Sequence, residues 1–154
     1  TTYNHLYGIP MVILRFFTVY GPRQRPEMVI SLYTRLIDEY IEVPVYGDGT
    51  CKRDYTYIDD ILDGIIAALN LKCNYEVFNL GSACPVDLNR VLEILEEKLE
   101  KKAIRKYLPR QIGDVDITYA DISKAKNMLS YYPKIHLEKG IEIFIKWYQN
   151  TKQI

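Results

Sequence analysis

The sequence predicts an α/β fold with parallel strands, because short apolar runs alternate with segments whose apolar residues recur at helical spacing. The clearest run, residues 11–17 (MVILRFF), is almost wholly apolar, as expected of a parallel strand that is buried on both faces. With 154 residues, 48% of them hydrophobic and 26% charged, the chain can form one packed core, and disorder is not expected.

The first elements follow from turn residues and periodicity. Residues 1–8 read as the end of a helix that stops at Gly8 ahead of Pro10. Because this helix would start without a capping residue, we expect the parent protein to extend upstream. After the strand, a loop at 20–26 leads into a helix, then a strand at 43–46 and a Gly-Asp-Gly turn at 47–49. One face of this helix is expected to carry Val29, Leu32, Tyr33, Leu36 and Tyr40.

The remaining elements continue the alternation. An extended segment at 54–58 precedes a helix that Asp59 or Asp60 can cap, and strands are expected at 77–81 and 104–108. Asp87 can cap the helix between those strands, and two helices close the chain, at 121–129 and from about residue 137. The residues expected to face inward are Ile61, Ile65, Ala68 and Leu69, then Leu88, Val91, Leu92, Leu95 and Leu99, and finally Ile141, Phe144, Ile145 and Tyr148.

Charge and cysteine content exclude several functions. The 20 basic residues balance the 20 acidic ones, so bulk attraction to nucleic acid or to an anionic membrane is not expected. The three cysteines are widely spaced and the two histidines lie far apart, which argues against a disulfide framework or a zinc site and favours a reducing cytoplasm. We see no membrane-spanning run and no signal peptide at the start.

Arginines follow several of the predicted strands, where ligands of open α/β sheets bind. Arg23 and Arg25 follow the first strand, Arg53 follows the second, and Arg110 follows the last with Asp114 nearby. Guanidinium groups match diphosphates and carboxylates in geometry, so they could bind such an anion. The alternative, that they are solvated loop charges, stays open.

Other motifs have simpler interpretations. The glycines of the turn at 47–49 lack the third glycine of a dinucleotide fingerprint, so a tight turn is favoured, and nothing in the chain would hold the NAD pyrophosphate. Helix capping explains the acidic pair Asp59 and Asp60 better than a catalytic dyad does.

Four segments in order resemble the extended short-chain dehydrogenase/reductase family of nucleotide-sugar epimerases and dehydratases. They are residues 15–26 (RFFTVYGPRQRP), 45–55 (VYGDGTCKRDY), 78–81 (FNLG), and 113–115 (GDV) leading to 120–125 (ADISKA). The resemblance covers nearly the whole chain and implies the C-terminal part of a Rossmann-type NAD(P)-binding epimerase fold. Residues 1–25 would be a remnant of the Rossmann domain, and residues 26–154 mainly the nucleotide-sugar-binding domain.

The resemblance also implies roles for individual positions. Phe16, Phe17, Thr18 and Val19 would pass the nicotinamide end of NAD, and Thr18 would also contact the sugar or diphosphate. The stretch of Pro44, Val45 and Tyr46 would hold the uracil with an aromatic ring stacked on it, and Met28 would line the nucleotide. Arg53 would pair with the diphosphate and Asp114 would bond the ribose. The family's usual second arginine stands where this chain has Gln111, with Arg110 beside it.

The segment at 15–26 is most similar to the UDP-glucuronate 4-epimerase branch, in which the positions of Thr18 and Arg25 hold the sugar carboxylate. Epimerisation passes through a 4-keto sugar, and a carboxylate on carbon six then makes a β-keto acid prone to lose carbon dioxide. A guanidinium clamp could hold that carboxylate out of overlap with the keto group. UDP-glucose 4-epimerases and UDP-glucuronate decarboxylases share most of the other motifs and stay open. A 4,6-dehydratase and a non-catalytic binding module also stay open.

The family's catalytic machinery is expected to lie outside this chain. The glycine-rich NAD loop is far upstream of these motifs, and the Tyr-x-x-x-Lys pair lies on the helix whose tail would be residues 1–8, where Tyr3 and Tyr7 have no lysine at the matching step. We therefore assign no catalytic residue here. We expect a chain that is inactive alone, contributes UDP-sugar contacts to an NAD-dependent isomerase, and comes from a parent that is a homodimer.

Overall fold

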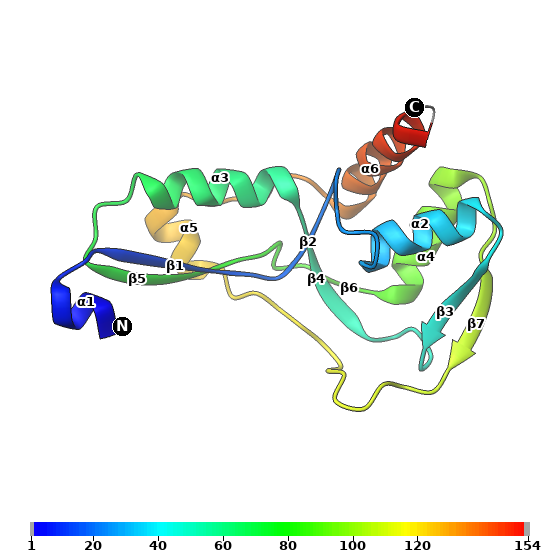
Figure 1. The fold of residues 1–154 in the computed structure, drawn as a ribbon, viewed down its shortest axis with the longest axis horizontal. Helices are drawn as coiled ribbons and strands as arrows, with labels where there is room; N and C mark the ends of the chain where they lie inside the picture. Colours follow the sequence, from blue (N-terminus) through cyan, green and yellow to red (C-terminus); the bar gives the residue numbers. More distant parts are fainter. Residues whose placement is uncertain (1, 153–154) are drawn as a thin grey trace.

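The computed structural model describes residues 2–152, so Thr1 of the predicted first helix lies outside them. The elements in chain order are α1 (Thr2–Tyr7), β1 (Met11–Phe16), β2 (Thr18–Tyr20), α2 (Val29–Asp38), β3 (Glu42–Tyr46), β4 (Lys52–Tyr57), α3 (Ile58–Leu69), β5 (Tyr75–Leu80), β6 (Pro85–Asp87), α4 (Leu88–Leu99), β7 (Ile104–Leu108), α5 (Ser123–Leu129) and α6 (Leu137–Lys152). The mixed α/β class is confirmed (Figure 1).

The strands form three small sheets. β1 pairs in parallel with β5, β3 with β7, and β2 with β4, and β6 adds to β4 in the antiparallel sense. The parallel pairing was predicted, whereas β2 and β6 were not. Each of these two strands has only three residues, too few for a recognisable alternation of apolar side chains.

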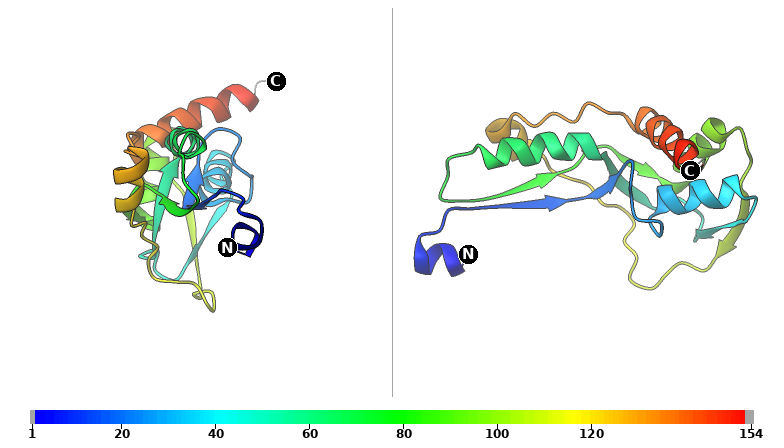
Figure 2. Two further views of the ribbon diagram at one scale, coloured as in Figure 1. Left: turned by 90° about the vertical axis from the view of Figure 1, so that its left-hand side faces the viewer. Right: turned by 45° about the horizontal axis from the view of Figure 1, so that its top comes forward.

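Helices α2 to α6 divide between two hydrophobic clusters at opposite ends of an elongated molecule, and α1 contributes to neither cluster (Figures 1 and 2). The larger cluster joins α2, α4 and α6 to β3 and β4, and the smaller one packs α3 and α5 against β5 and β1. The smaller cluster takes residues from both sides of position 25. The predicted division into residues 1–25 and 26–154 stays a prediction.

The structure confirms the predicted capping residue of α4 and most of the predicted inward faces of α4 and α6. Asp87 caps α4 by accepting a hydrogen bond from the Arg90 amide at 2.9 Å, as expected of an N-cap aspartate. The inward face of α4 is buried at Val91, Leu92, Leu95 and Leu99, and α6 buries Ile141, Phe144 and Ile145.

Four local expectations were wrong. α2 ends at Asp38, so Tyr40 leaves the helix with a φ of 55° and is 63% exposed. Leu69 at the end of α3 is 80% exposed, although its neighbour Ala68 is buried in the smaller cluster. β1 is not buried on both faces, since Ile13 is exposed. Tyr57 occupies the N-cap of α3, and the Asp60 carboxylate instead accepts backbone amides of residues 134 and 135.

Candidate functional site

A cavity of about 400 Å³ lies between the start of α2, the end of β3, the first part of β4, and the loop that follows β7. Its apolar wall consists of Val29, Leu32, Tyr33, Pro44, Tyr46, Tyr55 and Leu88. Its polar wall consists of Glu27, Cys51, Arg53, Gln111 and Asp114. An apolar and aromatic wall facing a few charged groups suits a ligand with a flat ring and an anionic group.

Strand alternation decides which residues of β3 face this cavity. Successive side chains of a strand point to opposite faces. Val43 and Val45 are fully buried in the larger core, while Pro44 and Tyr46 line the cavity. Of the three β3 residues predicted to hold a base, Val45 therefore offers only its backbone.

Two further tyrosines line the cavity that the sequence prediction missed. The Tyr33 hydroxyl donates to the Pro44 carbonyl, which ties α2 to β3. Burial raises the pKa of Tyr33 to about 12, with a smaller contribution from nearby Tyr46. Burial also raises the pKa of Tyr55 to about 12, although Arg53 opposes the shift. Both phenols therefore stay protonated at neutral pH. Tyr55 could have been found from its place two residues after Arg53, on the same face of β4.

Arg53 and Asp114 meet at the polar wall, although 61 residues separate them. Nη2 of Arg53 forms an ion pair with Oδ1 of Asp114, and Nη1 donates to the Lys52 carbonyl at 2.8 Å. Their side chains are 20% and 34% exposed. The structure thus brings together the two residues predicted to contact a diphosphate and a ribose.

Arg110 lies next to this pair but faces another hollow. Its Nη2 donates to the Asp114 carbonyl at 3.0 Å and forms an ion pair with Asp116. The hydrogen bond that Arg110 donates to the Asp116 carboxylate raises the pKa of Arg110. The hollow that Arg110 lines has a volume of about 500 Å³ and shares Cys51 with the main cavity.

The predicted residues of the first loop lie outside the cavity lining. Arg25 is 75% exposed, forms an ion pair with Glu27 at 3.3 Å, and donates to the Met28 sulfur at 3.7 Å. Met28 is the N-cap residue of α2. Thr18 is half-buried in β2, opposite Tyr55 in the ladder with β4. Of three arginines suggested above as anion ligands, Arg25, Arg53 and Arg110, Arg53 is the one among the described residues that lines this cavity.

The four residues predicted to contact the cofactor, at positions 16–19, point alternately away from the smaller core and toward it. Phe16 ends β1 and is 49% exposed, whereas Phe17 and Val19 pack against the smaller core. The Phe17 amide donates to the Leu80 carbonyl, which fixes the step from β1 to β2. Phe16 and Thr18 are therefore the residues of this set whose side chains do not pack against that core.

The sequence prediction also missed Asp54, a buried residue between Arg53 and Tyr55 whose carboxylate accepts five hydrogen bonds. Its carboxylate is fully buried. Oδ1 accepts from the Ser82 amide and hydroxyl, both at 2.7 Å, and from the Thr56 hydroxyl at 3.3 Å. Oδ2 accepts from the amides of Ala83 and Ala120, both at 3.0 Å. One carboxylate thereby joins β4 to the segments after β5 and before α5.

Comparison with known proteins places the chain in a family. The sequence profile described as the NAD dependent epimerase/dehydratase family matches residues 1–81, which is more than half of the chain. The chain belongs to the NAD dependent epimerase/dehydratase family. It is 46% identical over 147 residues to a UDP-glucuronate 4-epimerase of Thermodesulfobacterium geofontis, with 95% of this chain and 45% of the relative covered. The chain spans about half the length of the curated relatives it matches.

Solved structures agree with this membership of the epimerase/dehydratase family. A Bacillus cereus UDP-glucuronic acid 4-epimerase in complex with UDP-glucuronic acid and NAD superposes with a TM-score of 0.92 at 39% identity, over 97% of this chain and 48% of the other. A Thermotoga maritima UDP-glucose 4-epimerase with UDP-glucose superposes with a TM-score of 0.93 at 32% identity, over 98% and 50%. The fold is therefore that of part of a Rossmann-type epimerase.

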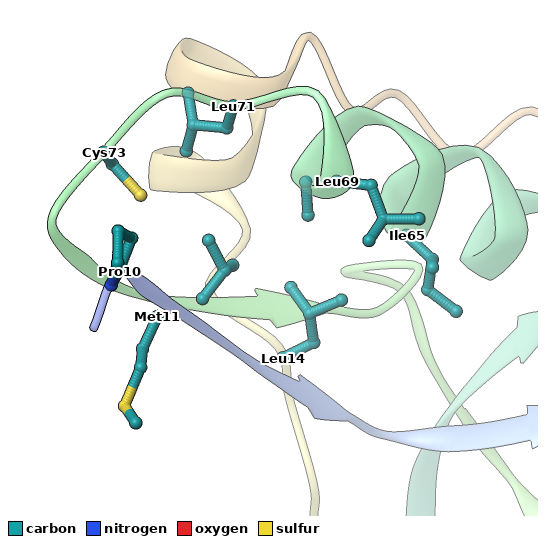
Figure 3. A pocket seen from close by; sticks show the side chains of 9 residues that line it. Pro10, Met11, Leu14, Ile65, Leu69, Leu71 and Cys73 are labelled. Carbon is teal, nitrogen blue, oxygen red and sulfur yellow. The ribbon is translucent and has the colours of Figure 1, made fainter. Parts of the chain in front are cut away.

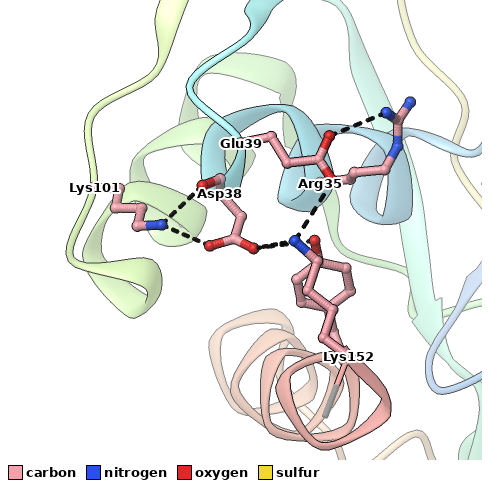
Figure 4. Close-up of polar contacts among 6 residues, drawn as sticks. Arg35, Asp38, Glu39, Lys101 and Lys152 are labelled. Carbon is pink, nitrogen blue, oxygen red and sulfur yellow. Dashed lines mark hydrogen bonds and ion pairs between the residues drawn. The ribbon is translucent and has the colours of Figure 1, made fainter. Parts of the chain in front are cut away.

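The Tyr-x-x-x-Lys spacing also occurs once in the sequence, at Tyr148 and Lys152 in α6, which is not the helix on which the family's pair is expected. There the two side chains bind Asp38, the hydroxyl at 3.2 Å and the ammonium at 2.7 Å, and Lys101 binds the same carboxylate (Figure 4). The cluster ties α6 to α2 and to the segment after α4, and none of its residues lines the main cavity. We interpret it as structural.

Another hollow, of about 340 Å³, lies between β1 and α3 (Figure 3). Its lining includes Pro10, Met11, Leu14, Ile65 and Leu69, and carries no charged side chain. It therefore does not suit a diphosphate. Over residues 2–152, no helix has the length and apolar character needed to cross a bilayer, and no group of three or more potential metal ligands comes together.

Proposed function

We propose that this chain is the UDP-sugar-binding part of an NAD-dependent UDP-sugar 4-epimerase whose substrate is UDP-glucuronate. The main support is the cavity that joins an aromatic and apolar wall to the Arg53–Asp114 pair. The relative at 46% identity is a UDP-glucuronate 4-epimerase, and one superposed structure contains UDP-glucuronic acid and NAD.

Each part of the cavity suits one part of a UDP-sugar. The exposed ring of Tyr46 offers a face on which uracil can stack, beside Pro44 and the backbone of Val45. The Arg53 guanidinium offers donors to the diphosphate, and Asp114 offers acceptors to the ribose hydroxyls. Met28 and Arg110 would complete the surroundings of the nucleotide.

The chemistry would be reversible oxidation at carbon four of the sugar, with NAD supplying the hydride acceptor and donor. The role of this chain is to hold the UDP group so that the sugar can turn while its nucleotide stays bound. Phe16, Phe17, Thr18 and Val19 would border the nicotinamide. We propose that the general base and the glycine-rich NAD loop are contributed outside these residues, so that the chain alone is inactive. A homodimer and a cytoplasmic location stay predictions.

Arg25 is the residue that would distinguish a sugar carboxylate from a hydroxymethyl group. Its side chain is 75% exposed and its partner Glu27 lines the cavity, so a modest reorientation could direct the guanidinium to a ligand at the cavity edge. UDP-glucose is the second candidate substrate, because a UDP-glucose 4-epimerase superposes equally well.

Binding of UDP-glucuronate and UDP-glucose to an Arg25→Ala variant tests the proposal. We expect affinity for UDP-glucuronate to fall about tenfold or more, because a charge-assisted hydrogen bond is lost, and affinity for UDP-glucose to change little. Arg23→Ala removes an exposed arginine of the same loop and serves as the matched control. Equal losses for both sugars in calorimetry would refute the carboxylate assignment. If neither UDP-glucuronate nor UDP-glucose binds the unmodified chain, the UDP-sugar function is refuted.

A further inference from the structure

The guanidinium that would receive the diphosphate is already paired in the structure. Arg53 is bound to the Asp114 carboxylate and to one backbone carbonyl, and both side chains are only partly exposed. An inorganic anion that approaches Arg53 therefore meets a neighbouring negative charge that water screens only in part. The site does not present a free positive charge.

The loop at 110–118 holds Asp114 in this position by backbone contacts. The Lys52 amide donates to the Asp116 carbonyl at 2.8 Å, and the Thr118 amide donates back to the Lys52 carbonyl at 3.1 Å. Arg110 binds the carbonyl of Asp114 itself at 3.0 Å. These contacts fix the loop against β4, the strand that carries Arg53.

A phosphate group can reach Arg53 in two ways, and both are unfavourable by themselves. It can separate Arg53 from Asp114, which leaves a partly buried carboxylate without its partner. It can also bind beside the intact pair, where it lies close to a like charge. This unfavourable free energy is offset when the ligand also carries hydroxyl groups that donate hydrogen bonds to the Asp114 carboxylate. A nucleoside diphosphate with a free ribose diol has both groups.

We infer that Asp114 is a specificity-determining residue that screens Arg53 from simple anions and yields it only to a ligand that offers a diol together with a diphosphate. This inference rests on the proposed function, since it concerns the same cavity. It gives Asp114 a second role beyond a ribose contact, which is to reject inorganic phosphate and pyrophosphate.

The test compares UDP, 2′-deoxy-UDP and inorganic pyrophosphate by calorimetry at fixed ionic strength, with the unmodified chain and with Asp114→Asn. In the variant we expect pyrophosphate to bind about tenfold more tightly, because the screening carboxylate is gone, and UDP to bind about tenfold more weakly. The unmodified chain should prefer UDP to its 2′-deoxy form, and the variant should not. Asp121→Asn removes one exposed negative charge outside the cavity and is the matched control.

Each outcome decides a separate point. Unchanged pyrophosphate affinity in Asp114→Asn, or equal binding of UDP and 2′-deoxy-UDP by the unmodified chain, would overturn the inference. A similar gain in pyrophosphate affinity in the Asp121→Asn control would also overturn it, because the effect would then come from net charge. If UDP fails to bind the unmodified chain, the proposed function is wrong, and the pyrophosphate comparison still shows whether Asp114 screens Arg53.

Discussion

Replacement of Asp54 by asparagine should destabilise the fold more than a typical polar substitution does. The buried carboxylate accepts hydrogen bonds at both oxygens, three at Oδ1 and two at Oδ2. An asparagine keeps one oxygen, so its amide group must face donors at the other position. If it faces the amides of Ala83 and Ala120, two buried backbone donors lose their acceptor, at about 1–3 kcal/mol each.

We therefore expect Asp54→Asn to lower the free energy of unfolding by about 2–6 kcal/mol, a large part of the roughly 5–15 kcal/mol that holds a domain folded. Urea unfolding followed by circular dichroism measures this change by linear extrapolation. Asp48→Asn is the control, because the Asp48 side chain is exposed and accepts its hydrogen bonds from the nearby Thr50 amide and hydroxyl. A loss below about 1 kcal/mol for Asp54→Asn would show that the hydrogen-bond accounting is wrong.

Two further predictions use other parts of the chain. UDP at ten times its Kd should slow alkylation of Cys51 about tenfold, because Cys51 lines the cavity and only the unbound fraction of the protein reacts. Alkylation of Cys73 and Cys84, which lie outside the cavity, should stay unchanged. Mass spectrometry of the alkylated peptides measures the three rates, and equal protection of all three cysteines would place the ligand elsewhere. Hydrogen bonds from two lysines lower the pKa of Asp38 from 3.8 to about 2. Because this pKa is lower in the folded state, the stability it contributes is complete above pH 3.8 and is lost as the pH falls toward 2. Urea midpoints at pH 7 and pH 3 should therefore differ less for Asp38→Asn than for the unmodified chain, and an unchanged difference would contradict the assignment.

The cavity could be predicted in part because parallel strands bring the residues after their carboxyl ends to one edge. β3 pairs with β7 over five residues, so Tyr46 and the loop that carries Asp114 leave the same side of the sheet. Arg53 joins them because Lys52, at the start of β4, binds that loop through its backbone. Motif order in the sequence was sufficient to name these three residues.

The other features of the fold and the site depend on contacts between residues far apart in the sequence, which local sequence patterns do not predict. The carboxylates of Asp54 and Asp60 each accept hydrogen bonds from backbone amides more than 25 residues away. No local capping or turn motif therefore predicts these partners. Strand alternation could have separated Val45 from its two neighbours, and it would also have added Tyr55 to the site. The pairing of Arg53 with Asp114 could not be seen, because a loop carboxylate at this distance in sequence has no fixed position until the loop docks on β4.

Three of the arginines that the sequence suggested as anion ligands share one arrangement, which changes how binding of an anion should be understood. Arg25 pairs with Glu27, Arg53 with Asp114, and Arg110 with Asp116. Binding of an anion at any of these is therefore an exchange of partners, and its net free energy is smaller than that of a guanidinium meeting an anion in isolation. The gain must come from groups that satisfy the displaced carboxylates and from rings that cover the aromatic wall. A ligand that has only charge supplies neither, so this arrangement of paired arginines favours a nucleotide over the small anions that surround it in solution.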